Sequence, residues 1–463
     1  MPKEDPVRVN EVRVSIVVVE LLVLMAASAC ASSGARPAPA APSAPALVSR
    51  AQPEDDRPLG QEDADEPTGI LTLPQAAALA LARNPELAAL SLELRAREGA
   101  VVQASARPNP VLEASVEDFA GTGAARGSSR SQSTVQLGQL FELGGKRPAR
   151  TRLAARAVDL ARWDYDARRN VIRGQVAQAY LEVLTAQERG VVTADIVRLA
   201  ERVSSTVAER VRAGKVAPIE ETRARAALAT TRLELDRVRR ELEAARRRLA
   251  ATWGSEDPRF DAVDGTLDAV ITVPSQEELA ARLSRNPELA RWDSEILQRR
   301  AALDLEEARR IPDVALSGGP RWLNESRDLA FVLFATVPLP IYNRNEGAIE
   351  EARQRLAKGE RERGVAGLRL TTALTETYRA LSTAAAEIAT LKTEVLPAAQ
   401  EAFEAVNEGY RFGKFGLVDV LEAQRTFFEA RSRMLRALSE YHKALAEVER
   451  LTNAPLTAGM REG

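Results

Sequence analysis

The hexapeptide RNPELA occurs twice in the chain, at residues 83–88 and again at residues 285–290. An Arg-x-Gly-Lys turn also occurs twice, at residues 212–215 and 411–414. Because both pairs are separated by about 200 residues, the sequence indicates an internal duplication, which requires the two halves to share one fold. The predicted parts are a signal peptide at 1–29, a tether at 30–70, a first repeat at 71–254, a linker at 255–274, a second repeat at 275–451 and a tail at 452–463.

Each repeat is predicted to open with a helix near the hexapeptide, followed by two strands, a very long helix, a glycine turn and a second helix. After Pro148, no proline interrupts the tract up to Ala213, and about 65 helical residues extend roughly 100 Å. In the second repeat, the tract at 347–412 contains only Pro397. Aromatic residues are only 4% of the chain, which favours long packed helices. An ordinary long coiled coil is the alternative.

Four short segments alternate between apolar and polar residues, as strands with two different faces do. They lie at 111–119, 131–141, 313–322 and 328–339. Strands of this length fit a membrane β-barrel. Four strands cannot close a barrel, and an open sheet edge is not tolerated in lipid, so other copies of the chain must supply the missing strands. The alternative is a small soluble hairpin sheet that caps a helical rod.

The N-terminal region resembles an export signal. Residues 12–29 form a short apolar run behind a basic flank, and the run ends in small residues. Cys30 follows Ala-Ser-Ala, which resembles a bacterial lipobox in which the cysteine is lipidated; ordinary cleavage beside an incidental cysteine is the alternative. Residues 31–67 are rich in proline, alanine and serine and then acidic, which is typical of a flexible tether. We therefore expect the protein in the periplasm or at the outer membrane.

Several function classes are disfavoured. The chain has one cysteine and one histidine, so it can form neither an internal disulfide nor a thiolate or imidazole metal cluster. It contains no nucleophile-elbow or phosphate-binding motif, and His442 is interpreted as a surface residue of a helix. We expect neither an enzyme nor a cofactor. Basic residues (64) nearly balance acidic ones (66) without a basic patch, which disfavours nucleic acid as a partner.

The duplicated helix-strand-strand-helix-helix order resembles the TolC-type outer-membrane efflux family. Two junctions, FELGGKR at 141–147 and VPLPIYNRNEG at 337–347, resemble its cobalt-zinc-cadmium resistance branch. The resemblance implies a mainly α fold, in which a homotrimer pools four strands per copy into a twelve-stranded barrel continued by an α-helical barrel. It also implies an exit duct for heavy-metal cations in the lipid of the outer membrane, served by a periplasmic adaptor and an inner-membrane RND pump. Alternatives are a drug or type I protein export duct, and a periplasmic rod without a pore.

The same resemblance assigns roles at the two helical turns, which are the far tips of the predicted rod. Tyr410 becomes a gate residue, Asp419 and Glu422 an acidic ring, and Glu220 the acid of the first turn. Phe415 stands where the family's gate commonly has an arginine. The alternative for the two carboxylates of the ring is a solvated helix face. The residues expected to dock the adaptor are Arg212, Gly214, Lys215, Arg411, Gly413 and Lys414.

Overall fold

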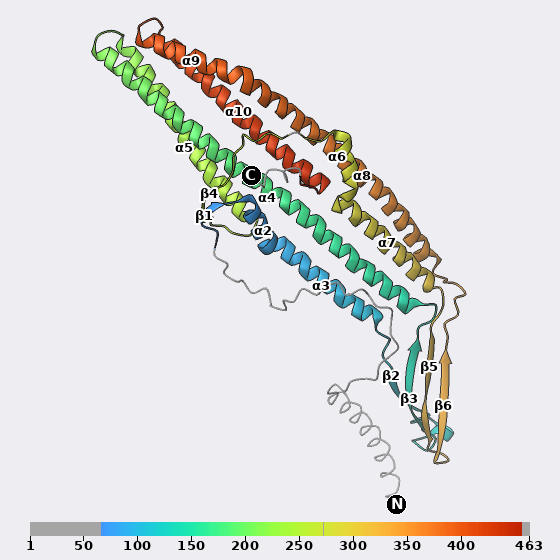
Figure 1. Cartoon of the computed structure of the whole chain (residues 1–463). Helices are drawn as coiled ribbons and strands as arrows, with labels where there is room; N and C mark the ends of the chain where they lie inside the picture. Colours follow the sequence, from blue (N-terminus) through green and yellow to red (C-terminus); the bar gives the residue numbers. More distant parts are fainter. Residues whose placement is uncertain (1–65, 272, 456–463) are drawn as a thin grey trace, which may run out of the picture. The chain divides into compact units, whose positions relative to one another are not determined.

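The computed structural model describes residues 66–271 and 273–455, and these form two compact units (Figure 1). Residues 108–141 and 313–337 make up the strand unit, and the other described residues make up the helical unit. The predicted signal peptide, most of the tether and the lipidation site Cys30 lie outside the described residues.

The strand unit is one antiparallel sheet in the order β2-β3-β5-β6. Its strands are β2 (Val111–Glu117), β3 (Gln132–Phe141), β5 (Val314–Leu323) and β6 (Asp328–Thr336), and a short 3-10 turn, η1 (Gly123–Ala125), lies in the loop between β2 and β3. All four predicted strands are therefore confirmed, with small differences at their ends. Among the described residues, β2 and β6 each pair along one side only, so both are sheet edges.

The two faces of this sheet differ in chemistry, because side chains alternate along each strand. Cross-strand pairing places Leu112, Leu137, Phe331 and Leu333 on one face, and all four are more than half exposed. The other face carries the polar residues Glu113, Glu117, Gln132, Thr134, Gln136 and Arg321. We call these two surfaces the apolar face and the polar face of the sheet.

The helical unit consists of long helices that lie side by side (Figure 1). Its elements are α2 (Leu73–Arg83), α3 (Pro85–Ser105), α4 (Lys146–Arg212), α5 (Pro218–Ala251), α6 (Gln276–Arg282), η2 (Leu283–Arg285), α7 (Pro287–Ala308), α8 (Glu346–Thr390), η3 (Leu391–Val395), α9 (Leu396–Arg411) and α10 (Leu417–Thr452). The first predicted long helix is confirmed as the 67-residue α4. Its counterpart consists of α8, η3 and α9 in succession, and the π-helical segment η3 ends two residues before Pro397.

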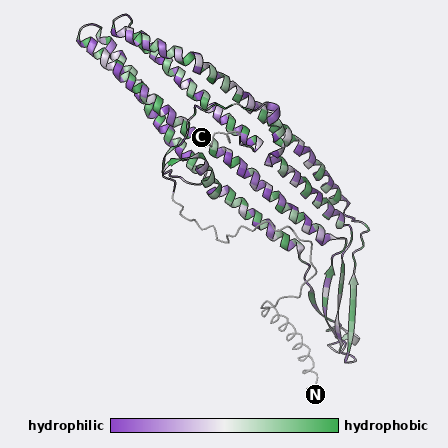
Figure 2. Cartoon of the chain, viewed as in Figure 1, coloured by the Kyte–Doolittle hydropathy of each residue, from purple (hydrophilic) through white to green (hydrophobic). Residues whose placement is uncertain are grey.

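Polar and apolar residues are mixed along the whole length of these helices (Figure 2). Charged residues recur within every long helix, as a helix that packs one side against neighbours and exposes the other requires. In the described part of the chain, no helix combines the length and apolar character needed to cross a membrane.

The opening helix of each repeat is not continuous, contrary to the prediction. Asn84 ends α2 and caps α3, and Asn286 caps α7, with each side-chain carbonyl accepting hydrogen bonds from backbone amides of the new helix. Each Nδ2 also donates to a carbonyl oxygen at the end of its own repeat, Thr252 or Leu451, at 2.8 Å. The hexapeptide therefore joins the start of each repeat to its end.

The predicted tether and linker are also partly ordered. Strand β1 (Gly69–Leu71) pairs in parallel with β4 (Phe260–Val263). The Tyr180 hydroxyl hydrogen-bonds to the carbonyl oxygens of Leu71 (3.0 Å) and Asp264 (2.6 Å). Burial and the nearby Asp264 carboxylate raise the pKa of Tyr180 to about 12. The linker, which connects α5 to α6, thus packs on α4.

His442 is not a plain surface residue. One of its ring nitrogens lies 2.8 Å from the carbonyl oxygen of Leu267, in the segment that follows β4. The neighbouring Tyr441 is fully buried, and its hydroxyl bonds to the backbone of Ile271. Burial lowers the pKa of His442 below its ordinary value. The prediction was wrong because the linker covers this part of α10.

The glycines and the proline of the two junctions have structural roles. Gly144 and Gly145 follow β3 with φ values of +70° and +73°, which glycine adopts without strain. A Cβ on Gly144 would also come within 2.9 Å of the Ala308 carbonyl oxygen. β6 ends at Thr336, two residues before Pro338, which lacks the amide needed to extend the ladder.

Candidate functional site at the helical tips

The two tips of the helical unit share one backbone turn. After α4, the amide of Lys215 donates to the Arg210 carbonyl, and after α9 the amide of Lys414 donates to the Gly409 carbonyl. Gly214 and Gly413 have φ values of +65° and +77°. This pattern is the Schellman motif, in which a left-handed glycine lets the last carbonyls of a helix find donors. The repeated Arg-x-Gly-Lys sequence is therefore a helix stop in both repeats.

A small apolar core holds the two tips together. Its buried members come from α4, α5, α9 and α10, and they are Val203, Val207, Ala224, Phe403, Tyr410, Leu417 and Val420. Phe427 stacks on Phe403 with ring centroids 6.1 Å apart. This core is separate from the larger one around β1, β4 and the middle of the helices. The tips therefore pack on a core of their own.

Tyr410 is the centre of the contact between the two tips. Its side chain is 3% exposed, and its hydroxyl lies 3.4 Å from Glu220 Oε2 on α5. The Arg210 guanidinium from α4 lies 4.3 Å from the centre of the Tyr410 ring, and it also donates to the Tyr410 backbone carbonyl. Burial raises the pKa of Tyr410; Glu220 adds to this rise, and Arg210 opposes it. A neutral tyrosine thus links the first tip to the second.

The other predicted gate residues lie on the outside of the second tip. Phe415, Asp419 and Glu422 are exposed, and they line a groove of about 310 Å³ between α9 and α10. Asp419 accepts a hydrogen bond of 2.8 Å from the Gly416 amide, at the start of α10. The Phe415 ring covers Gly409, where a Cβ would come within 2.4 Å of the ring. The structure thus brings Tyr410 and Glu220 together, but Asp419 and Glu422 do not contact them.

The predicted docking residues are all on the surface. The side chains of Arg212, Lys215, Arg411 and Lys414 are exposed, and both turn glycines are exposed as well. Phe412 between them is 73% exposed. Four cations and an aromatic ring are therefore available to a partner at the two turns.

Sequence reasoning did not identify Arg210. The family resemblance placed an arginine near the position of Phe415 on the second tip, whereas the structure supplies a cation to Tyr410 from α4 of the first repeat. The two residues are 200 positions apart, and no local pattern connects them. The sequence signal that could have indicated Arg210 is its position as a basic residue close to the first turn.

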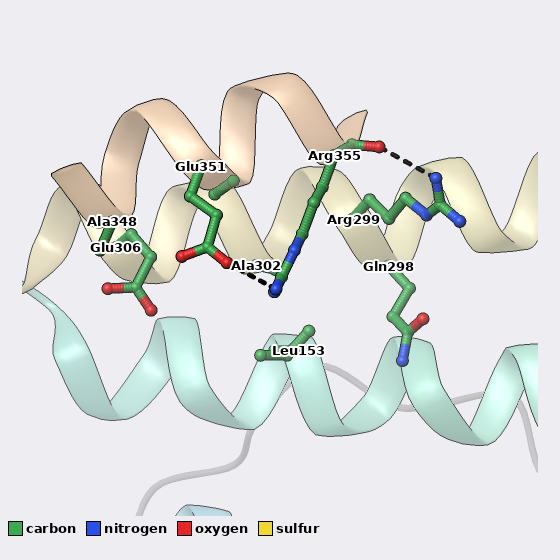
Figure 3. A pocket seen from close by; sticks show the side chains of 9 residues that line it. Leu153, Gln298, Arg299, Ala302, Glu306, Ala348, Glu351 and Arg355 are labelled. Atoms are coloured by element: carbon green, nitrogen blue, oxygen red, sulfur yellow. Dashed lines mark hydrogen bonds and ion pairs between the residues drawn. The ribbon is translucent and has the colours of Figure 1, made fainter. Parts of the chain in front are cut away.

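A second hollow, of about 260 Å³, lies between α4, α7 and α8 (Figure 3). The charges around it are paired: Arg355 lies 2.5 Å from Glu351, and Arg299 donates to the Arg355 carbonyl at 2.9 Å. Across the described residues, no group of three or more histidine, cysteine or carboxylate side chains has the arrangement to hold a metal ion. The tips therefore remain the candidate site.

Comparison with known proteins agrees with this architecture. The model of the family described as "Outer membrane efflux protein" matches residues 76–255 and 279–454. The chain is 37% identical over 386 residues to the cobalt-zinc-cadmium resistance protein CzcC of Cupriavidus metallidurans, covering 83% of this chain and 91% of that protein. It is 28% identical to the nickel and cobalt resistance protein CnrC of the same organism, covering 60% of this chain and 66% of that protein.

A solved structure of CusC, described in terms of transmembrane channel formation, has the same fold. It superposes with a TM-score of 0.71 at 15% identity, covering 84% of this chain and 94% of that one. The matched family segments contain the hexapeptide junction at 84 and 286 and the tips of both repeats. The chain belongs to the outer membrane efflux protein family.

Proposed function

We propose that this protein is the outer-membrane exit duct of an efflux system that exports divalent heavy-metal cations. The family membership supports the duct. The cargo is inferred from relatives whose names describe resistance to cobalt, zinc, cadmium and nickel. The match to the first of these covers 83% of this chain and 91% of that protein, and it includes the junction stretches at 141–147 and 337–347.

The sheet supports a multimeric duct. β2 and β6 are free edges among the described strands, and the apolar face is exposed along its length. A sheet with one apolar face and two open edges is stable in lipid only when other copies close it. Three copies would give the twelve-stranded barrel of the resembled family, with the apolar face toward lipid and the polar face toward the passage. Lipidation of Cys30 would add a lipid anchor near the N-terminus.

The tips support a gate. Tyr410 and Glu220 connect two helix pairs through one hydrogen bond, on a core of seven buried residues. A link of this kind contributes about 1 kcal/mol, so it can hold a resting state closed and still be broken by a partner. Asp419 and Glu422 on the exposed surface would form the acidic ring, which favours cations in a narrow pore.

The exposed cations and Phe412 at the turns are the proposed docking surface for a periplasmic adaptor, which would connect the duct to an RND pump in the inner membrane. A duct passes its cargo on and does not need to retain it, so a strong metal site is not required. No catalytic role is proposed.

The observation that carries the proposal is the near full-length match to a metal resistance protein together with the open-edged sheet. The test is growth of a deletion strain on graded zinc, cobalt and cadmium, in parallel with hydrophobic drugs and detergents. The expected result is that the deletion strain is hypersensitive to these metals and that the intact gene restores its growth. Hypersensitivity to drugs alone would contradict the metal cargo while keeping the duct.

A further inference from the structure

Arg321 is the single basic residue of the four strands β2, β3, β5 and β6. It lies on the polar face, which also carries the carboxylates of Glu113, Glu117 and Asp328. The apolar face has no such group of one arginine and three carboxylates. Arg321 therefore belongs to the charge pattern of the polar face and does not serve only to make the sheet soluble.

The Arg321 guanidinium is held in one place by neighbours on β2 and β3. Its Nε donates to Thr134 Oγ1 at 2.9 Å, and its Nη1 donates to Gln132 Oε1 at 3.2 Å. Its Nη2 lies 3.9 Å from Glu117 Oε2, and the arginine side chain is only 23% exposed. The Gln132 amide donates in turn to Asp118 at 2.9 Å. A fixed cation in contact with a carboxylate is thus built into this end of the sheet.

The loops next to this cluster are tied to each other. The Asn324 amide donates to the Ser131 carbonyl at 3.0 Å, and its side chain donates to the Ser128 carbonyl at 2.7 Å. Arg130 lies 3.0 Å from Glu325 across the same pair of loops. The end of the sheet that carries Arg321 is therefore braced, which keeps the charge in a defined position.

Below Arg321, β5 contributes only small residues to the polar face. Gly319 and Ser317 follow on the same face of β5, and Gly138 opposes Ser317 on β3. A Cβ on Gly319 would come within 2.0 Å of the Val135 carbonyl oxygen, so no larger residue fits there. Along β5 itself, Arg321 is therefore followed on this face only by small residues.

We infer that Arg321 is a specificity-determining residue of the duct, which balances the carboxylates of the polar face and limits the preference for cations at the barrel exit. The inference rests on the proposed function, in which three copies close the sheet with this face toward the passage. Rings of charged side chains set ion selectivity in pores, and passage also requires that ions are not held too strongly. Arg321 meets the second requirement by lowering the net negative charge.

The test is the reversal potential of the purified protein in a planar bilayer under a potassium chloride gradient. The permeability ratio of potassium to chloride should rise about two-fold or more in Arg321→Gln, because the carboxylates lose their counter-charge. Arg321→Lys keeps the charge and should stay close to the wild-type ratio. Arg126→Gln removes the same charge from an exposed loop position and should leave the ratio unchanged.

Glu117→Gln provides an independent variant if Arg321→Gln does not assemble, and it should lower the ratio. Wild-type ratios in both Arg321→Gln and Glu117→Gln would overturn the inference, as would an equal rise in Arg126→Gln. Failure of the wild-type protein to form any channel would instead overturn the proposed duct. The two failures are therefore distinguishable.

Discussion

Glu220 and Asp419 occupy equivalent positions of the two repeats, since each is the third residue of its helix, α5 or α10, but they make different contacts. Asp419 bonds to the Gly416 amide at the start of its own helix and stays exposed. Glu220 is half-buried and accepts a hydrogen bond from Tyr410 of the other tip. The duplication thus supplied two similar tips, and one carboxylate now connects them.

The hexapeptide junctions show the opposite outcome. Asn84 and Asn286 both cap a helix, and both bind the end of their own repeat at the same distance. The two halves have therefore kept the same junction where stability requires it. They differ at the tips, where the proposed gate requires an asymmetric contact.

The largest predicted effect tests the shared junction. Asn286→Ala removes a helix cap and leaves the buried Leu451 carbonyl without its donor, at a cost of about 2–4 kcal/mol. Asn84→Ala should cost somewhat less, because Asn84 is 9% exposed and Asn286 is 2% exposed. Thermal unfolding of the detergent-solubilised protein measures both. Serine at either position keeps a capping oxygen and should recover part of the lost stability. Destabilisation by only one of the two alanine variants would show that the two junctions are not equivalent.

The next effect tests the link between the tips. Tyr410→Phe and Glu220→Gln should be non-additive, with a coupling free energy of up to about 1 kcal/mol, because both act on the same hydrogen bond: phenylalanine removes its donor, and glutamine replaces the charged acceptor with a neutral amide oxygen. The matched pair is Tyr410→Phe with Asp419→Asn, which should be additive since Asp419 makes no contact with Tyr410. Equal coupling free energies in the two double-mutant cycles would show that Glu220 and Asp419 interact with Tyr410 to the same extent.

Alkaline pH should release the same link. The pKa of Tyr410 is raised by burial and by Glu220, so the folded state prefers the neutral phenol. Its contribution to stability is complete below the unfolded pKa of about 10 and is lost as pH rises through the higher folded value. Absorbance of tyrosinate in the wild type minus that in Tyr410→Phe isolates this group from Tyr180. A difference curve with its midpoint at or below 10 would contradict the buried contact.

The smallest effect concerns Asp419 alone. Asp419→Asn weakens a bond at the start of α10 and should cost about 0.5 kcal/mol. Hydrogen exchange of the Gly416 amide should become faster, and the amides around Tyr410 should be unaffected. Faster exchange on both tips would mean that Asp419 also supports the contact between them.

Much of the fold could be predicted because local patterns determine it. The duplication, the long helix α4, the four strands and both glycine turns follow from spacing, alternation and helix stops. The break at Asn84 was missed although Asn-Pro-Glu is a typical helix start, because the apolar pattern continues across it. β1 and β4 have three and four residues, too few for a visible alternation.

The site was less predictable, because its contacts are distant in sequence. Tyr410 and Glu220 were proposed as separate gate elements from the family resemblance, and their mutual contact comes from packing across 190 residues. Arg210 could not be identified, since its role depends on a ring from the other repeat. His442 was misinterpreted because the linker that covers it has no strong pattern of its own.

The most direct test of the central claim, a duct closed at its tips by Tyr410, is the single-channel conductance of the purified protein in a planar bilayer. We predict a low conductance with cation preference in the wild type, and a higher conductance or a reduced preference when Tyr410→Phe is combined with Asp419→Ala. Conductance and selectivity equal to the wild type in that double variant would contradict a gate at the tips.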